Sequence, residues 1–270
     1  MKLNAEQVVQ FEERGYLLLR GALTDADLDP IIAEYEAHIG RRAEQMLAEG
    51  KISELYAHEP FNRRLVSICR ENNEIYKELD IMHFRGRALF EFLRNDNLLD
   101  LVESLVGPEI TCNPIQHLRP KLPAGLTPAG GDAHVARWHQ DMAVMRAEAD
   151  PHLIVTAWRP LAASTPENGC LQIIPGSHKS ILPKQGDQLS AEERAIHAPD
   201  EKRLYLEMES GEVALLHNWT LHRSEPNKTD RPRRAFSVCY IDSATVHRKS
   251  GERWPQVFPE YIPIKTPADS

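Results

Sequence analysis

The segment GEVALLHNWTLHRSEPNKTDRPRRAFSVCYID, residues 211–242, contains the alternation of apolar runs and turns that decides the fold. The apolar run EVALLH leads into a polar turn that holds His222, and a basic turn then leads into the second apolar run, AFSVCYI. Apolar runs of this length, bounded by turn residues, are typical of β-strands. We therefore expect His222 on a connection at the end of a sheet and Arg233 at the start of the returning strand.

Short apolar runs separated by turns continue through the chain from residue 110 onward. There are seven: ITCNPIQHL, HVARWHQD, HLIVTAW, CLQIIP, RLYLEM, EVALLH and AFSVCYI. This spacing predicts a mainly β protein with flanking helices, in which the strands form a double-stranded β-helix, a jelly roll or cupin-like barrel.

The first hundred residues have a different pattern, which is mainly helical. A capping sequence at Thr24 precedes apolar residues at helical spacing, and a second helix fits residues 97–105 before the stop at Gly107-Pro108. The run GYLLLR, residues 15–20, predicts one short strand. We expect a single domain over residues 1–270, with a helical support region at 1–109, a barrel core at 110–245 and a C-terminal extension at 246–270.

One run carries a candidate metal site. Side chains at positions i and i+2 of a strand point to the same face, so His139 and Asp141 can bind one ion together. A histidine from a later element, His222, would complete two histidines and one carboxylate, a set typical of non-haem Fe(II) oxygenases. Among the twelve histidines only His139 is followed two residues later by an acidic residue.

Three arginines follow His222 and could bind an anion. The guanidinium is a planar, permanently charged fork that suits a carboxylate. Strand alternation would put Arg231 and Arg233 on one face and Arg234 on the other. The spacing of eleven residues from His222 favours Arg233.

Four motifs together resemble the phytanoyl-CoA dioxygenase family of Fe(II)- and 2-oxoglutarate-dependent oxygenases. They are WHQD at 138–141, TAW at 156–158, ENGCLQIIPGSHK at 167–179 and HRSEPNKTDRPRR at 222–234, and the resemblance covers about half the chain. It implies Fe(II), 2-oxoglutarate and O2 as cofactor and cosubstrates. The implied reaction is hydroxylation of a small organic substrate with release of succinate and CO2.

The same resemblance implies roles for individual residues. His139, Asp141 and His222 would be the iron ligands, and Arg233 would bind the distal carboxylate of 2-oxoglutarate. Further cosubstrate contacts are implied for three residues: Ser224, Trp158 and Gln116.

Arg137 is the candidate substrate residue. It stands two positions before His139, so strand alternation would direct it inward, near the metal. A buried charge is costly unless it is paired. Arg137 would therefore be in an ion pair or contact an anionic group of the substrate.

Two other functions remain open from the sequence. Two histidines and one carboxylate also bind zinc, so a zinc-dependent hydrolase or isomerase on a cupin-like barrel is the alternative, although Arg233 and Ser224 have no clear task in it. A non-catalytic binding protein is a third, which the complete ligand set argues against. Halogenation is not expected, because the resemblance implies that related halogenases have a small residue in place of Asp141.

Composition limits the partners. A formal net charge of −8 argues against nucleic acid, and no apolar run approaches the ~20 residues of a membrane span. The start, MKLNAEQVVQFEERG, lacks the apolar core of a secretory signal and predicts an amphipathic helix. Four cysteines without paired spacing suggest reduced thiols. We expect a cytoplasmic protein that acts on a small molecule, without nucleic acid or membrane partners.

Overall fold

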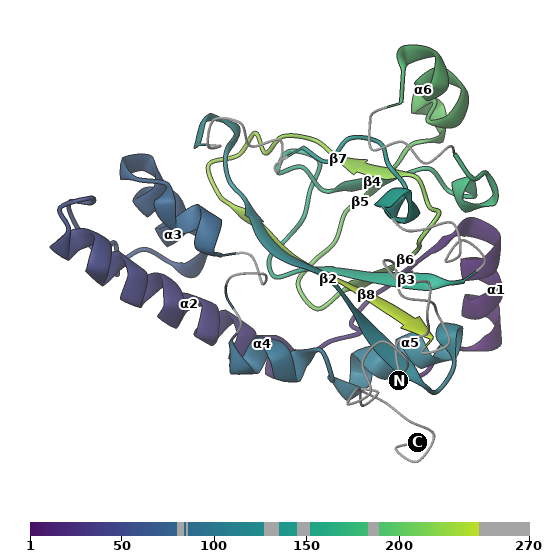
Figure 1. The fold of residues 1–270 in the computed structure, drawn as a ribbon, viewed down its shortest axis with the longest axis horizontal. Coiled ribbons are helices and arrows are strands. Elements are labelled where there is room, and N and C mark those ends of the chain that lie inside the picture. The colour runs from purple at the N-terminus through teal and green to yellow at the C-terminus, as the bar shows by residue number, and fades with distance from the viewer. Residues whose placement is uncertain (80–83, 85, 127–134, 145–151, 183–188, 243–270) are drawn as a thin grey trace.

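Two antiparallel sheets form the centre of the molecule (Figure 1). The computed structural model describes residues 1–79, 84, 86–126, 135–144, 152–182 and 189–242. The first sheet has five strands in the order β1-β6-β3-β8-β2, and the second has three strands in the order β5-β4-β7. Their bounds are β1 Tyr16–Leu19, β2 Ile110–Lys121, β3 Ile154–Pro160, β4 Leu171–Ile173, β5 Leu204–Leu206, β6 Val213–His217, β7 His222–Ser224 and β8 Arg233–Asp242.

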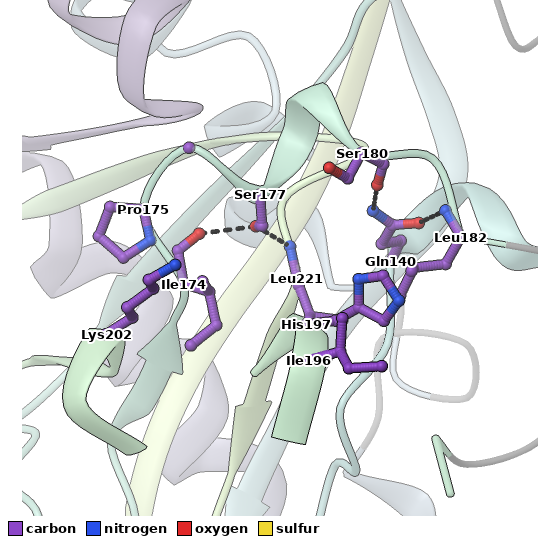
Figure 2. A pocket seen from close by; sticks show the side chains of 11 residues that line it. Gln140, Ile174, Pro175, Ser177, Ser180, Leu182, Ile196, His197, Lys202 and Leu221 are labelled. Carbon is purple, nitrogen blue, oxygen red and sulfur yellow. Dashed lines mark hydrogen bonds between the residues drawn. The ribbon is translucent and has the colours of Figure 1, made fainter. Parts of the chain in front are cut away.

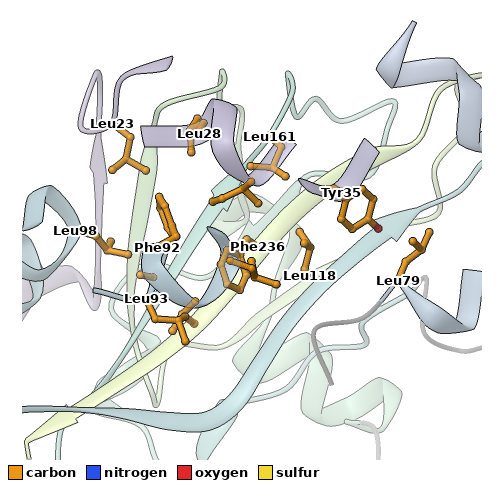
Figure 3. Packing of buried hydrophobic residues seen from close by; sticks show 14 of the residues in the cluster. Leu23, Leu28, Tyr35, Leu79, Phe92, Leu93, Leu98, Leu118, Leu161 and Phe236 are labelled. Carbon is orange, nitrogen blue, oxygen red and sulfur yellow. The ribbon is translucent and has the colours of Figure 1, made fainter. Parts of the chain in front are cut away.

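Helices pack along one face of the five-stranded sheet, opposite the three-stranded sheet (Figure 1). The α-helices are α1 Ala5–Arg14, α2 Asp25–Ala48, α3 Phe61–Glu71, α4 Arg87–Phe92, α5 Asp96–Val106 and α6 Ala191–His197. The main core lies between helices α1–α5 and the five-stranded sheet, where Tyr35 of α2 and Phe92 at the end of α4 pack with Phe236 of β8 (Figure 3). Helix α6 lies apart from this core, on the side of the three-stranded sheet (Figure 1).

The helix ends follow the local sequence. Asn4 and Gln7 form a capping box at the start of α1, and Gly15 ends that helix in the left-handed conformation, with φ of 75°. Thr24 and Asp27 form the equivalent box at the start of α2. The predicted helices and the predicted strand at residues 15–20 are therefore confirmed.

The inner face of the five-stranded sheet meets the second sheet in a separate apolar cluster. Trp158 of β3, Ala214 of β6 and Ala235 of β8 pack there against Leu171 and Ile173 of β4. Since the strands alternate, neighbouring residues of β8 point either into this space or toward the helices. Residues that face the space between the sheets are placed to build a site.

Two expectations about the strands were wrong. Residues 135–138 are not a strand, and His139 makes only an isolated bridge with His222 before a 3-10 turn at Asp141–Val144. His222 does not lie on a connection, because it begins the short strand β7. The other six predicted runs each contain a strand, and Arg233 begins β8 as expected.

Other features of the described residues agree with the composition. All four cysteines are free. None of the described helices has the length and apolar character needed to cross a bilayer. The C-terminal extension predicted at residues 246–270 lies outside the described residues.

Candidate metal centre

His139, Asp141 and His222 come together although no continuous strand carries the first two. The backbone N–H of His139 donates to the carbonyl of His222 and the reverse bond is also made, each at 3.0 Å. The 3-10 turn that follows His139 then brings Asp141 beside both rings. Asp141 Oδ1 lies 3.7 Å from His139 Nε2 and 3.6 Å from His222 Nε2.

The two histidines are held in the tautomer that a metal requires. His139 Nδ1 donates to the carbonyl of Arg137 at 2.7 Å, and His222 Nδ1 donates to the carbonyl of Thr220 at 2.9 Å. Because a carbonyl can only accept, each Nδ1 carries a proton, and Nε2 is the ring nitrogen left to bind a metal. The candidate ligand atoms of the three residues all lie within 4.8 Å of one another, which fits a single ion.

The charge states also suit a metal. Loss of solvation, with a contribution from the nearby His222, lowers the pKa of His139 to about 4, so His139 is neutral at pH 7. Burial alone would raise the pKa of Asp141, but the two histidines and a hydrogen bond from Thr156 outweigh it and lower that pKa. Thr156 Oγ1 donates to Asp141 Oδ2 at 2.7 Å, so Asp141 is an oriented carboxylate.

Gln140, which lies between the candidate ligands His139 and Asp141 in sequence, points away from them. Its amide nitrogen donates to the carbonyls of Trp219 and Ser180 at 2.7 and 2.9 Å, and its oxygen accepts from the backbone of Leu182 at 3.1 Å. These bonds fix the segment that carries His139 and Asp141 (Figure 2).

A pocket of about 180 Å³ lies beside the Gln140 side chain, and His139, Asp141 and His222 do not line it (Figure 2). Its lining is Gln140, Ile174, Pro175, Gly176, Ser177, Ser180, Leu182, Ile196, His197, Lys202 and Leu221. The pocket is therefore distinct from the cluster of His139, Asp141 and His222.

Arg233 lies on the inner face of β8 and is buried, with its guanidinium 5.2 Å from the centre of the Trp158 ring. Its Nε and Nη1 have no hydrogen-bond partner. Burial lowers the pKa of Arg233 to about 10, and the side chain remains charged at pH 7. A buried guanidinium with two unpaired nitrogens is suited to an incoming carboxylate.

The other two arginines lie in different surroundings. Strand alternation predicts Arg231 on the same face as Arg233. That prediction is wrong, because Arg231 is exposed and precedes β8. Arg234 is buried on the opposite face, with its guanidinium 3.6 Å from the centre of the Phe61 ring. Of the three candidates, only Arg233 is on the inner face of the sheet.

Ser224 and Trp158 are both buried, and the ring of Trp158 lies beside the Arg233 guanidinium. Ser224 ends β7, two residues after His222, and its hydroxyl accepts from Lys121 at 2.7 Å. Gln116 lies in β2 opposite Val238 of β8.

Arg137 is exposed rather than buried. Residues 135–138 are not a strand, so the alternation that would direct Arg137 inward is absent. Its contact with substrate stays a prediction without that support.

Sequence reasoning missed Thr156 and Lys121. Thr156 could have been found, because it stands two residues before Trp158 on one strand face. Lys121 gave no signal, because a lysine at a strand end is usually solvated. In the structure it is 4% exposed and faces Arg233 across the β2–β8 pair.

Comparisons with known proteins agree with this geometry. A family model described as phytanoyl-CoA dioxygenase (PhyH) matches residues 11–235. The human peroxisomal phytanoyl-CoA dioxygenase is 27% identical over 252 residues, which cover 91% of this chain and 70% of the human protein. The name of that relative places it in peroxisomes, so a cytoplasmic location for this chain stays a prediction.

Two solved structures share the fold. EctD from S. alaskensis, with 2-oxoglutarate and 5-hydroxyectoine, has a TM-score of 0.59 and 19% identity, covering 93% of this chain and 80% of that one. The epimerase SnoN in complex with Fe3+, alpha ketoglutarate and nogalamycin RO also has a TM-score of 0.59 and 19% identity, covering 96% and 89%. The predicted cupin-like jelly roll with outer helices is thus confirmed, and the family match over most of its length shows that the chain belongs to the phytanoyl-CoA dioxygenase family.

Proposed function

We propose that the protein is an Fe(II)- and 2-oxoglutarate-dependent dioxygenase that hydroxylates a small organic substrate and releases succinate and CO2. The observation that carries the proposal is the convergence of His139, Asp141 and His222, whose candidate ligand atoms lie within 4.8 Å of one another. Two imidazoles and one carboxylate leave coordination positions open, which is the arrangement of non-haem iron oxygenases.

Each residue of the site has a task in this reaction. His139, Asp141 and His222 would hold Fe(II), which supplies the activation of dioxygen. Arg233 would bind the distal carboxylate of 2-oxoglutarate through its unpaired Nε and Nη1. Trp158, whose ring lies against that guanidinium, would form an apolar wall of the cosubstrate site, and Ser224 would add a hydrogen bond. Gln116 is a further candidate contact.

Hydroxylation is our choice among several outcomes known for this fold. The similar structures include SnoN, an epimerase, and SnoK, a carbocyclase. Asp141 favours an oxygen-transfer outcome over halogenation, because its carboxylate fills the position that a halide would need. The zinc-dependent hydrolase or isomerase leaves the unpaired, buried Arg233 without a function.

A substrate screen tests the proposal. The protein, reconstituted anaerobically with Fe(II), is given 2-oxoglutarate, O2 and a library of small polar molecules, and succinate formation is measured. We expect succinate above the uncoupled background only with Fe(II), together with a product 16 mass units heavier than the substrate, from one oxygen atom. Activity with Zn(II) that needs neither 2-oxoglutarate nor O2 would replace the proposal with the hydrolytic alternative.

A further inference from the structure

Two buried basic side chains face each other across neighbouring strands at one end of the site. Lys121 ends β2 and Arg233 begins β8, and the two residues are register partners. Lys121 is 4% exposed and Arg233 is 7% exposed. Because cross-strand partners point to the same face of a sheet, both side chains lie on the inner face.

Lys121 is held close to the predicted cosubstrate contact Ser224. Its Nζ donates to Ser224 Oγ at 2.7 Å and also to the backbone carbonyl of Glu225. Gly169 packs closely against the Lys121 side chain. It has φ of +78°, and a Cβ at this position would lie 3.1 Å from Lys121 Nζ, so a larger residue would crowd the lysine. An ammonium group has three donors, so one remains for a ligand.

No described carboxylate neutralises this pair. The carboxylate of Glu225 is bonded to Arg223 at 2.5 Å and lies 3.8 Å from Arg203, while only its carbonyl reaches Lys121. Two adjacent buried cations without an anion are unfavourable, since each has lost its hydration and they repel each other.

The ionisation of Lys121 reflects this environment. Burial is the main cause that lowers the pKa of Lys121 to about 6, and the positive charge of Arg233 contributes to this shift. The other groups that act on it are Cys170 before β4 and Glu225 after β7, both of which oppose the shift. In the ligand-free protein Lys121 is therefore mostly neutral at pH 7.5.

We infer that Lys121 is a second contact for the distal carboxylate of 2-oxoglutarate, and that it takes up a proton when this carboxylate binds beside Arg233. The inference rests on the proposed function and adds a specific residue and a proton linkage to it. A carboxylate placed between the two side chains supplies the missing negative charge, which raises the proton affinity of Lys121. Binding should therefore weaken as the pH rises above about 6.

Isothermal titration calorimetry can test this proton linkage. The Ni(II)-loaded protein is titrated with 2-oxoglutarate at pH 7.5 in two buffers of different ionisation enthalpy, so that the difference in heat reports the protons taken up. We expect about one proton per ligand in the wild type. The control ligand 2-oxopentanoate has the same chain length but no distal carboxylate, and we expect it to bind without proton uptake.

Three variants separate this role from a purely structural one. Lys121→Met should bind 2-oxoglutarate about 10- to 100-fold more weakly and without proton uptake, as for the loss of a hydrogen bond to a charged group. Lys121→Arg should bind without proton uptake, because guanidinium stays charged. Lys228→Met, which changes an exposed lysine, should behave as the wild type. Thermal unfolding of each variant shows whether it is folded.

The outcomes distinguish this inference from the proposed function. The inference is confirmed if the wild type takes up a proton on binding 2-oxoglutarate and both Lys121 variants do not. If Lys121→Met does not fold, the result for Lys121→Arg decides. Binding of 2-oxoglutarate without proton uptake, or with uptake unchanged in Lys121→Arg, overturns the inference and leaves the proposed function intact. A wild-type protein that binds no 2-oxoglutarate would instead contradict the proposed function.

Discussion

Thr156 orients Asp141, because its hydroxyl donates a 2.7 Å hydrogen bond to Asp141 Oδ2 and leaves Oδ1 directed at the two histidines. The hydroxyl also lies 3.4 Å from Cys239 Sγ on the neighbouring strand β8. In the proposed metal site, a carboxylate fixed in this way would present one defined oxygen to the ion.

Removing this hydrogen bond should weaken the site without abolishing it. Thr156→Val keeps the shape of the side chain but leaves Asp141 Oδ2 without its donor, so we expect about 10- to 100-fold lower Fe(II) affinity or activity. Anaerobic Fe(II) titration measures the affinity. Thr156→Ser keeps the hydroxyl and should restore most of the loss. Equal affinities for the valine variant and the wild type would show that Thr156 does not orient the ligand.

Loss of a metal ligand should be more severe. Asp141→Ala or His222→Ala should remain folded but lose more than about 100-fold in Fe(II) affinity, beyond the range for residues that only support a ligand. The exposed His58→Ala serves as a matched histidine control, for which we expect unchanged binding. Unchanged iron affinity in both ligand variants would disprove the assignment.

Arg233 should be the sensitive arginine for the cosubstrate. Arg233→Leu should raise the KM for 2-oxoglutarate by about 30-fold or more, equivalent to about 2–5 kcal/mol, because a buried charged partner of the carboxylate is lost. Arg231→Leu removes an exposed charge and should leave that KM unchanged. Arg234 lies against Phe61 on the opposite face, so we expect Arg234→Leu to lower stability more than cosubstrate affinity. A larger effect on KM from either of these variants would contradict the role of Arg233.

The protein should lose stability in mild acid through His217. This residue closes β6, accepts a hydrogen bond from the backbone of Trp219 and packs against His178 and Phe11. Burial lowers its pKa to about 4, with a contribution from His178. The unfolded chain, with a histidine pKa of ~6.5, binds the proton first, so stability falls as the pH drops from about 6.5 to 4.

His217→Gln removes this titration while keeping an acceptor for the Trp219 N–H. At pH 5 the wild-type penalty from His217 is about 2 kcal/mol, so the urea midpoint of the variant should fall less between pH 7 and pH 5 than that of the wild type. Parallel declines in the two proteins would show that other groups cause the acid sensitivity.

Much of the architecture could be predicted from local sequence. The helices around Thr24 and Gly107 and the strands at residues 154–160, 213–217 and 233–242 follow capping, stop and apolar patterns that are short in range. The chemical identity of the centre was also readable, because only His139 has an acidic residue two positions later and the family motifs supplied His222 and Arg233.

Local patterns failed where long-range pairing sets the direction of a side chain. Strand alternation predicts the facing of residues 135–141 and of Arg231, yet neither segment is a strand. Alternation holds only where a neighbouring strand pairs with the backbone. The side-chain direction of His139 is set instead by the two backbone hydrogen bonds that it exchanges with His222, and that of Asp141 by the 3-10 turn that it begins.

The sequence by itself determined the family, the strand-rich core and the types of group available for chemistry, because these depend on residue identity and short-range spacing. Only the tertiary structure decided which groups meet. It placed Thr156 behind Asp141, and it buried Lys121 opposite Arg233 through pairing of strands more than a hundred residues apart, from 121 to 233. A lysine gains or loses its charge according to that environment, which no local pattern specifies.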